Sequence, residues 1–336
     1  MKNLILGFLI LVSSLVFGQI PDGYYDDAEG LTGEQLKTAL HDIIDNHVEY
    51  SYNDLRDFIL KNTDEDPENS DNVILLYTGR SQAKNTFGGN PNEWNREHVW
   101  AKSHGDFGNT PPCGTDAHHI RPTDVSVNGL RGNLDFDEGG TPLSEAPGCK
   151  KDGDSFEPRD EVKGDVARMI LYMAVRYEGG SGEPDLEVVD YVNTSPAPEH
   201  GKLQKLLDWN MIDPPDDFEL NRNEVIYGYQ ENRNPFIDHP EYANFIWGDP
   251  NSTFEEKSIT FSVYPNPCNT MLYINGSENT NSTYELFSFD GKKVDAGELS
   301  PSTKSIDLTK LDNGLYLLLF KVNNNTSLQT FKVVKQ

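Results

Sequence analysis

Positive charge is scarce in this 336-residue sequence. The 28 lysines and arginines are outnumbered by 55 aspartates and glutamates, so the formal net charge is −27 at pH 7. A charge of this sign argues against any partner that is bound through overall positive charge. The acidity is uneven, however, because residues 80–133 contain about as many basic as acidic side chains. The local field in that stretch need not repel an anion.

Long hydrophobic runs are also rare. Residues 4–17 form one, which follows Lys2 and Asn3 and ends before the small residue Gly18. A basic start, a short apolar core and a small residue at the end are typical of a secretory signal peptide. A membrane-spanning helix is the alternative, but the run is short for a bilayer. We therefore expect residues 1–18 to be removed before Gln19, and the mature protein to be secreted without a transmembrane segment.

Cysteine is the third scarce feature, with only three in the chain. In an exported protein this number suggests one disulfide and one unpaired thiol. Cys113 and Cys149 both lie in sequence rich in proline and glycine, so we predict that they form the disulfide and that Cys268 stays single. Such a bond would stabilise the fold by about 3–4 kcal/mol. Two free buried thiols are the alternative.

Hydrophobic periodicity divides the remaining chain into two domains. Residues 164–177, 202–210 and 221–229 have helical spacing, and 73–77 and 94–100 read as apolar strands. From Ile259 onward the pattern alternates with period two and is interrupted by turn residues. The sequence predicts an α+β fold: a mostly helical domain over 19–250, a linker over 251–258 and a small all-β sandwich over 259–336.

Residues able to carry out chemistry gather between positions 96 and 133. Glu97 and Asn128 offer hard oxygen atoms that suit Mg²⁺ or Ca²⁺, and His98 is a base with a pKa near the working pH. In a regular strand Glu97 and His98 point to opposite faces, so both can serve one site only near a strand end or bulge. Asn128 and Arg131 are three apart and share a helix face. These are the parts needed for phosphodiester hydrolysis.

Two segments carry a specific family resemblance. The stretches WNREHVWAKSHG (94–105) and DAHHIRPTDVSVNGLRGN (116–133) resemble the endonuclease I family of secreted and periplasmic nucleases, which have a ββα-metal (His-Me) active site. The resemblance extends over roughly residues 30–247. It implies nonspecific, Mg²⁺-dependent cleavage of DNA, and often of RNA, to products with 5′-phosphates; Ca²⁺ and Mn²⁺ are alternative ions. We also expect the protein to be a monomer.

The resemblance assigns roles position by position. It makes His98 the general base, makes Glu97 and Asn128 the metal ligands, and places Arg131 on an arginine of the motif with a catalytic role. Asp116 and His118 fall in a part of the motif that is structural or supports the ligands. The helix over 164–177 is mostly core, and three basic residues in or next to it are candidate phosphate contacts: Lys163, Arg168 and Arg176. Which arginine stabilises the cleaved phosphate is left open.

The β-rich end of the chain carries a second resemblance. Its opening Tyr264-Pro265-Asn266-Pro267, the turn Asn313-Gly314-Leu315-Tyr316 and the terminal FKVVK over 331–335 resemble the C-terminal sorting domain of type IX secretion cargo. This implies the type IX machinery as a partner, and a tail that is removed or exchanged for a surface anchor. A carbohydrate-binding sandwich is the alternative.

Two other functions compete with the nuclease hypothesis. A zinc hydrolase could use the histidines His98, His104, His118 and His119, although no His-Glu-x-x-His helix is present. A non-catalytic, calcium-binding surface adhesin would agree with the acidity and the sorting tail. It would leave the Arg-Glu-His and Asn-Gly-x-Arg motifs unexplained.

Overall fold

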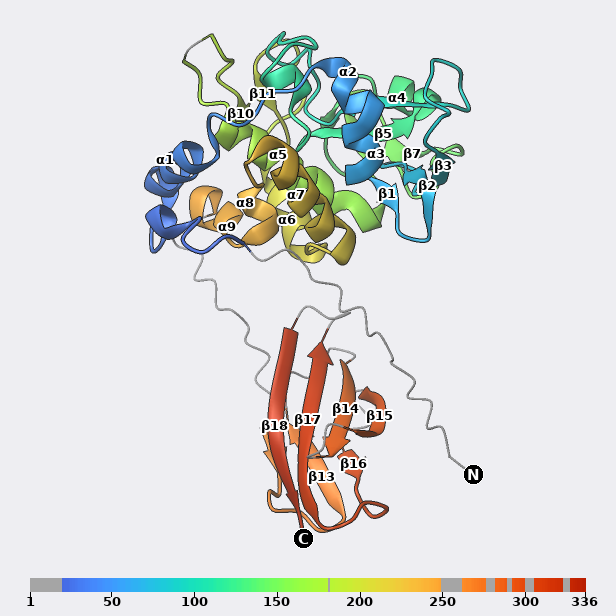
Figure 1. The fold of residues 1–336 in the computed structure, drawn as a ribbon, viewed down its shortest axis with the longest axis vertical. Coiled ribbons are helices and arrows are strands. Elements are labelled where there is room, and N and C mark those ends of the chain that lie inside the picture. Colours follow the sequence, from blue (N-terminus) through green and yellow to red (C-terminus); the bar gives the residue numbers. More distant parts are fainter. Residues whose placement is uncertain are drawn as a thin grey trace, which may run out of the picture. The chain divides into compact units, whose positions relative to one another are not determined.

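The computed structural model describes residues 20–180, 182–248, 262–275, 282–288, 292–299, 305–322 and 327–336. The chain divides into two compact units, residues 1–249 and 250–336 (Figure 1). The predicted signal peptide 1–18 and linker 251–258 lie outside the described residues. No helix in the described part of the chain is both long and apolar enough to cross a membrane.

Helices form most of the regular structure in the first unit. The α-helices are α1 (Gly33–Ile44), α2 (Tyr52–Asp54), α3 (Leu60–Thr63), α4 (Val125–Arg131), α5 (Lys163–Arg176), α6 (Leu203–Ile212), α7 (Asp217–Gln230), α8 (Pro235–Asp238) and α9 (Tyr242–Trp247). One π-helical turn, η2 (Leu55–Ile59), joins α2 to α3. Short 3₁₀ turns are η1 (Asp26–Ala28), η3 (Cys113–Thr115) and η4 (Asp160–Val162).

The strands of the first unit form several small sheets. Strands β1 (Glu65–Asp66), β2 (Asn69–Ile74) and β3 (Ser81–Ala83) make one sheet, and β4 (Trp94–His98) pairs with β5 (Ile120–Asp124) in another. The third has the order β6-β9-β8-β7: β6 (Asp135–Phe136), β9 (Ser155–Glu157), β8 (Lys150–Lys151) and β7 (Thr141–Pro142). Strands β10 (Glu187–Val188) and β11 (Glu199–His200) pair in parallel. The chain therefore has both helices and sheets, as an α+β fold requires.

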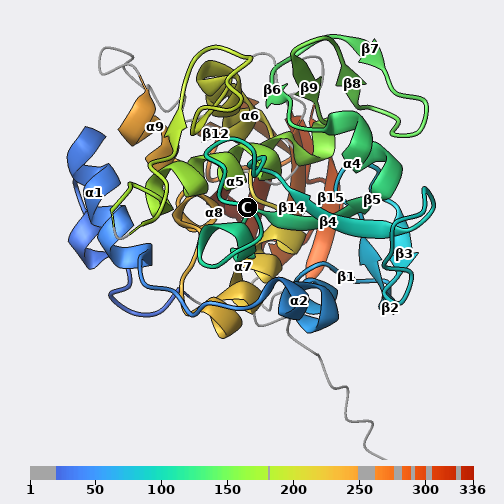
Figure 2. The same cartoon turned by 90° about the horizontal axis from the view of Figure 1, so that it is seen from above.

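Helix α5 is the centre of the first unit, because every one of its residues is buried. Apolar residues such as Val166, Ile170 and Met173 belong to a core that also includes Leu36 and Leu40 of α1 and Leu206 of α6. Burying apolar area of this kind is the dominant favourable term in folding. Seen from above, α1 and the β4–β5–α4 segment lie on opposite sides of α5 (Figure 2).

The second unit is built from strands alone in its described part. One sheet contains β12 (Ser262–Tyr264), β13 (Met271–Asn275) and β16 (Ser305–Asp307). The other has the order β15-β14-β17-β18, namely β15 (Lys293–Leu299), β14 (Ser282–Ser288), β17 (Gly314–Val322) and β18 (Ser327–Lys335). Leu272 of the first sheet and Leu286 and Leu318 of the second share one core. The alternating pattern read from the sequence is the pattern of strands with one face in such a core.

Candidate active site

The predicted general base, metal ligands and catalytic arginine lie on strand β4 and on helix α4, which follows the antiparallel partner of that strand. Strand β4 pairs with β5 in a register that sets His98 opposite Ile120 and Trp94 opposite Asp124. Helix α4 begins at Val125, directly after β5 ends. Within the described residues, β5 is the one named strand that pairs with β4, and the second edge of β4 makes an isolated bridge between Trp94 and Phe87. The rest of that edge carries no neighbouring strand in the described part of the chain. That free edge is where α4 and β4 meet.

Two side chains of α4 bind carbonyl groups along the free edge of β4. Asn128 donates through Nδ2 to Asn95 Oδ1 (2.9 Å) and to the Arg96 carbonyl (3.3 Å). One turn later, Arg131 donates through Nη1 to the His98 carbonyl (3.1 Å) and through Nη2 to the Val99 carbonyl (2.7 Å). Residues three apart share a helix face, and the carbonyls of alternate strand residues point to the same side. The helix is thereby fixed along the strand.

His98 is held in one tautomer by its surroundings. Its Nε2 atom lies 3.1 Å from the Gly114 carbonyl, and since a carbonyl oxygen can only accept, Nε2 carries the hydrogen. Its Nδ1 atom makes no hydrogen bond with any described residue, and the residue is 6% exposed. Burial, and then the neighbouring His119, lower the pKa of His98 well below its usual value. The ring is therefore neutral at pH 7, with an unshared lone pair on Nδ1.

Glu97 is buried on the other face of β4. Its Oε1 atom accepts a hydrogen bond from the Tyr77 hydroxyl (2.6 Å) and lies 3.3 Å from Arg131 Nη1. Burial raises the pKa of Glu97, while Arg131 and the Tyr77 hydrogen bond act against that rise. A second cation at this carboxylate would favour the ionised form further.

The donor set fits a hard divalent cation. Oε2 of Glu97 and Oδ1 of Asn128 make no hydrogen bond with the described residues, whereas the Asn128 amide is oriented by its two Nδ2 bonds. Asn128 is bound to β4 through the Arg96 carbonyl, and Glu97 follows Arg96 on that strand. Carboxylate and amide oxygens are the ligands that Mg²⁺ and Ca²⁺ prefer, with water filling the remaining positions.

Arg131 is enclosed and is not placed to contact a substrate. It is 1% exposed, its two terminal nitrogens bind the carbonyls described above, and Nη2 also lies 3.1 Å from His200 Nε2. Its guanidinium packs 4.7 Å from the centre of the Phe136 ring. The sequence predicted a catalytic role for Arg131; its contacts in the structure are with Glu97 and with the carbonyls at the end of β4.

Asp116 and His118 lie in a buried hydrogen-bond network. The Asp116 carboxylate accepts from the hydroxyls of Tyr172 (2.8 Å) and Tyr177 (3.0 Å) and from Gln230 Nε2 (3.0 Å). Burial by itself would raise the pKa of Asp116, but nearby histidines and the Gln230 hydrogen bond outweigh it and hold this pKa low. His118 Nε2 binds the Asn232 carbonyl (3.2 Å). These contacts join the segment before β5 to α5 and to the end of α7.

The three basic residues predicted to touch phosphate are buried in ion pairs. Arg168 is fully buried and pairs with Glu219. Arg176 is 2% exposed and pairs with Asp45 (2.8 Å) and Glu183 (2.9 Å). Lys163 pairs with Glu157 (2.9 Å) and Asp160 (2.7 Å). These ion pairs argue against direct phosphate contacts by the three residues, because carboxylates already bind their charged groups.

The predicted disulfide is also absent. Cys113 and Cys149 are both free thiols and both buried. The Cys149 thiol donates to the Tyr77 carbonyl (3.3 Å), and Cys113 begins the 3₁₀ turn η3. The thiols belong to separate local contacts in the same apolar core, which is the alternative that the sequence left open.

One group of metal-ligating residue types was missed by sequence reasoning. His104, Asp135 and His200 are buried, and one donor atom of each lies within 4.8 Å of the others. Their nitrogens already have partners: His104 faces the carbonyls of Glu199 (2.8 Å) and Asn133 (2.7 Å), and His200 Nε2 faces the Arg131 guanidinium. A cation next to Arg131 would be repelled. The group is a hydrogen-bonded support behind Arg131, and no sequence pattern joins its members.

The histidines of the zinc hypothesis are not gathered around one point. His118 binds the Asn232 carbonyl, His119 binds the Cys113 carbonyl (3.0 Å) and His104 lies with His200. Within the described residues, these histidines form no shared ligand group.

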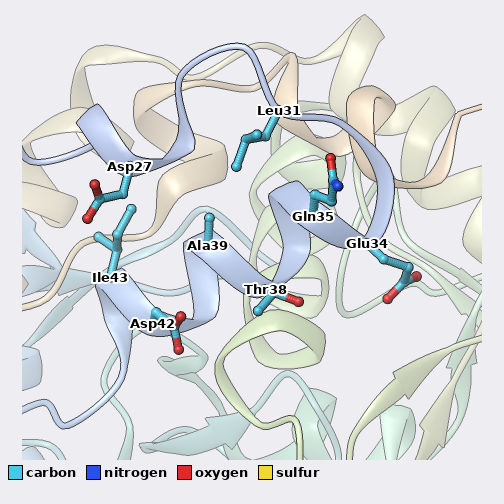
Figure 3. A pocket seen from close by; sticks show the side chains of 8 residues that line it. All are labelled: Asp27, Leu31, Glu34, Gln35, Thr38, Ala39, Asp42 and Ile43. Atoms are coloured by element: carbon cyan, nitrogen blue, oxygen red, sulfur yellow. The ribbon is translucent and has the colours of Figure 1, made fainter.

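A surface pocket of about 750 Å³ is a poor candidate for the chemistry. It is lined by η1, α1 and the segment between them, with the side chains of Asp27, Glu34 and Asp42 beside Leu31 and Ile43 (Figure 3). Helix α1 lies across α5 from β4 (Figure 2), and none of the predicted site residues lines the pocket. Its acidic walls would repel phosphate.

Comparisons with known proteins agree with both resemblances. The family model described as Endonuclease I matches residues 32–241, and that of the secretion system C-terminal sorting domain matches residues 262–336. Two relatives are named extracellular ribonuclease. The Bacillus subtilis protein is 62% identical over 227 residues, which cover 67% of this chain and 78% of the relative. The Bacillus amyloliquefaciens protein is 60% identical over 225 residues, with the same coverage.

Among solved structures, a Bacteroides vulgatus protein with an immunoglobulin-like β-sandwich fold covers 23% of this chain and 96% of its own, at 13% identity. Its TM-score of 0.19 is too low to support an argument. The first family model covers more than half of the chain, over the part that contains the β4–β5–α4 site. The second accounts for the β-rich tail and for export. The chain belongs to the endonuclease I family and is a secreted nuclease that carries a C-terminal sorting domain.

Proposed function

We propose that the protein is an extracellular, divalent-metal-dependent endonuclease that hydrolyses phosphodiester bonds of nucleic acids without sequence preference. His98 is the general base, and Glu97 and Asn128 bind the ion, for which Mg²⁺ is the best candidate. The observation that carries the proposal is the tautomer of His98: Nε2 is bound to the Gly114 carbonyl, and Nδ1 has no hydrogen-bond partner among the described residues. Glu97 is the neighbouring residue on β4, and Asn128 binds the same strand through the Arg96 carbonyl.

The base works by taking one proton from a water molecule. His98 Nδ1 accepts that proton, and the resulting hydroxide attacks the phosphorus atom. A P–O bond forms to the hydroxide as the bond to the 3′-oxygen breaks, so the product keeps a 5′-phosphate and the 3′-oxygen takes a proton from solvent. The Gly114 carbonyl stabilises the imidazolium that forms. General-base catalysis of this kind contributes about 10²–10⁴-fold.

The ion, when bound, would offset negative charge on the phosphate and on the leaving oxygen. Glu97 and Asn128 supply its oxygen ligands. The Tyr77 hydroxyl and Arg131 keep the Glu97 carboxylate in place, and Asn95 keeps the Asn128 amide turned so that its oxygen is free. We therefore treat Arg131 as a positioning residue.

The charges near His98 suit an anionic substrate despite the acidity of the whole chain. Burial is the largest cause that lowers the pKa of His98, and the charges of Lys102 and Arg96 lower it further, so these two side chains add positive potential at the ring. Charges beyond a Debye length of about 8–10 Å are screened at physiological salt. The relatives carry the name ribonuclease, and the resemblance implies DNA cleavage as well. We propose RNA and DNA as substrates.

A cleavage assay tests the proposal. Plasmid DNA and a structured RNA are incubated with wild-type protein and with His98→Ala in Mg²⁺, in Zn²⁺ and in EDTA, and the product ends are mapped. We expect cleavage by the wild type in Mg²⁺, no cleavage in EDTA, and nearly complete loss in His98→Ala with unchanged folding.

The competing functions predict different results in the same assay. A zinc hydrolase of another class would leave both nucleic acids intact, and an adhesin would show no hydrolysis in any metal. Substantial activity of a folded His98→Ala protein would refute the role of the base, and RNA products ending in a 2′,3′-cyclic phosphate would refute attack by water.

A further inference from the structure

Arg96 differs from every other arginine of the chain, because it has no carboxylate partner among the described residues. Each of the others has a carboxylate oxygen at 3.3 Å or less: Arg56, Arg80, Arg121, Arg131, Arg159, Arg168, Arg176, Arg222 and Arg233. In so acidic a protein a lone guanidinium is unusual. Its position beside the proposed site makes it a candidate for binding an anion that comes from outside.

The surroundings of Arg96 only partly replace the water that it has lost. The residue is half-buried, with its guanidinium carbon 3.4 Å from the centre of the Tyr52 ring and 5.1 Å from that of Phe87. Nη1 donates to the Tyr52 carbonyl, whereas Nε is buried with no hydrogen-bond partner. Aromatic faces stabilise a cation, but an unsatisfied buried donor remains costly. Nη2 makes no hydrogen bond with the described residues and is not among the buried unpaired atoms, so it is the donor that a bound anion would reach.

Arg96 also lies on the same side of the strand as the proposed base. Residues two apart on β4 point to the same face, so the side chains of Arg96 and His98 are neighbours. The Tyr52 ring joins them, because it is stacked on His98 with centres 5.6 Å apart and lies against Arg96. Arg131, by contrast, is enclosed behind Glu97.

We propose that Arg96 contacts a nonbridging oxygen of the phosphate that His98-activated water attacks, and that Tyr52 holds the guanidinium in place for it. The inference rests on the proposed nuclease function, and it names Arg96 as the side chain whose positive charge binds the phosphate. A planar guanidinium matches two phosphate oxygens at once. The contact would strengthen as negative charge accumulates on those oxygens, and would therefore lower the barrier to hydrolysis.

The test compares three variants at Arg96 with one matched control. Arg96→Ala, Arg96→Gln and Arg96→Lys are assayed for cleavage of a labelled oligonucleotide in Mg²⁺. The control, Arg56→Ala, removes the same charge from a guanidinium that also lies near Phe87 but is paired with Asp57. We expect Arg96→Ala and Arg96→Gln to lose about 10–100-fold in kcat/KM, as for a hydrogen bond to a charged group. Arg96→Lys should recover part of this loss, and Arg56→Ala should stay near wild type.

A binding measurement separates phosphate contact from a structural role. Oligonucleotide affinity is measured over a salt series in His98→Ala, with and without Arg96→Gln. Losing one phosphate contact should reduce the slope of log affinity against log salt by about 1, which a merely structural defect would not do. Tryptophan fluorescence checks folding, and Arg96→Gln, which keeps a donor for the Tyr52 carbonyl, decides the question if the alanine variant unfolds.

The outcomes distinguish this inference from the function on which it rests. Wild-type cleavage together with equal rates for Arg96→Gln and Arg56→Ala, or an unchanged salt slope, would overturn the role of Arg96. Absence of wild-type cleavage in every metal would overturn the proposed function itself.

Discussion

Replacing His118 by glutamine should change how the stability of the first unit depends on pH. Burial is the largest cause that lowers the pKa of His118, to about 4, compared with about 6.5 in an unfolded chain. Glutamine can keep the donor to the Asn232 carbonyl but cannot titrate. The two proteins therefore differ by one proton-binding group.

The sign follows from the protonation states. Above about pH 6.5 His118 is neutral in the folded and in the unfolded chain, and it contributes no pH dependence. As pH falls from 6.5 towards 4, His118 binds a proton in the unfolded chain but not in the folded chain, so the unfolded state is stabilised relative to the folded state. With these two pKa values, the wild type should lose about 2 kcal/mol between about pH 7.5 and about pH 5 through His118 alone. Asp116, whose pKa is held low, does not titrate in this window.

Urea unfolding followed by tryptophan fluorescence measures the effect. All four tryptophans lie before residue 250, at positions 94, 100, 209 and 247, so the signal reports the first unit. His118→Gln should be less stable than the wild type at about pH 7.5. The difference between their free energies of unfolding should be smaller by about 2 kcal/mol at about pH 5. Titrating groups that do not interact with His118 are common to both proteins and cancel in the comparison.

Tyr172→Phe is a matched control in the same network, since it removes the hydroxyl that binds Asp116 and Asn232. Burial raises the pKa of Tyr172 well above 10, so this variant should lose stability by the same amount at both pH values. A gap between wild type and His118→Gln that stays constant, or that widens on acidification, would refute the reasoning that His118 is buried as a neutral ring.

Three further predictions concern the metal, the thiols and processing. Calorimetry should show weaker Mg²⁺ binding for Glu97→Ala and for Asn128→Ala than for Glu93→Ala, a carboxylate outside the proposed ligand set; equal affinities would show that the ligand set is wrong. Thiol titration without reductant should find the buried Cys113 and Cys149 unreactive in the folded protein and reactive in urea, and loss of either thiol from the unfolded count would indicate a disulfide. Burial also raises the pKa of Cys149, to about 11, which slows its reaction further. The intact mass of the secreted protein should lack the first ~18 residues and the β-rich tail from near Ser258, so a mass that includes the whole tail would contradict its removal.

The sequence alone predicted the features of this protein that depend on neighbouring residues. The 3.6-residue spacing over 164–177 predicted α5, which runs from Lys163 to Arg176, and the alternating pattern after residue 259 predicted strands. The motif around Glu97 and His98 and the segment with Asn128 identified the family, because a reacting group must be of a particular residue type at a particular spacing. Such constraints are written in neighbouring residues and can be read without the fold.

Only the tertiary structure decided which charged and sulfur-containing side chains are available. Arg131, Arg168 and Arg176 look like phosphate ligands in the sequence, yet each is enclosed with a carboxylate. Arg96 differs from these arginines because no carboxylate of the described residues forms an ion pair with it. The carboxylates that pair with Arg131, Arg168 and Arg176 come from positions up to 131 residues away, as Asp45 does for Arg176. Cys113 and Cys149 likewise remain unbonded because of how distant segments pack. Which side chains pair and which are buried depends on how segments far apart in the sequence pack together. No local pattern in the chain encodes that packing.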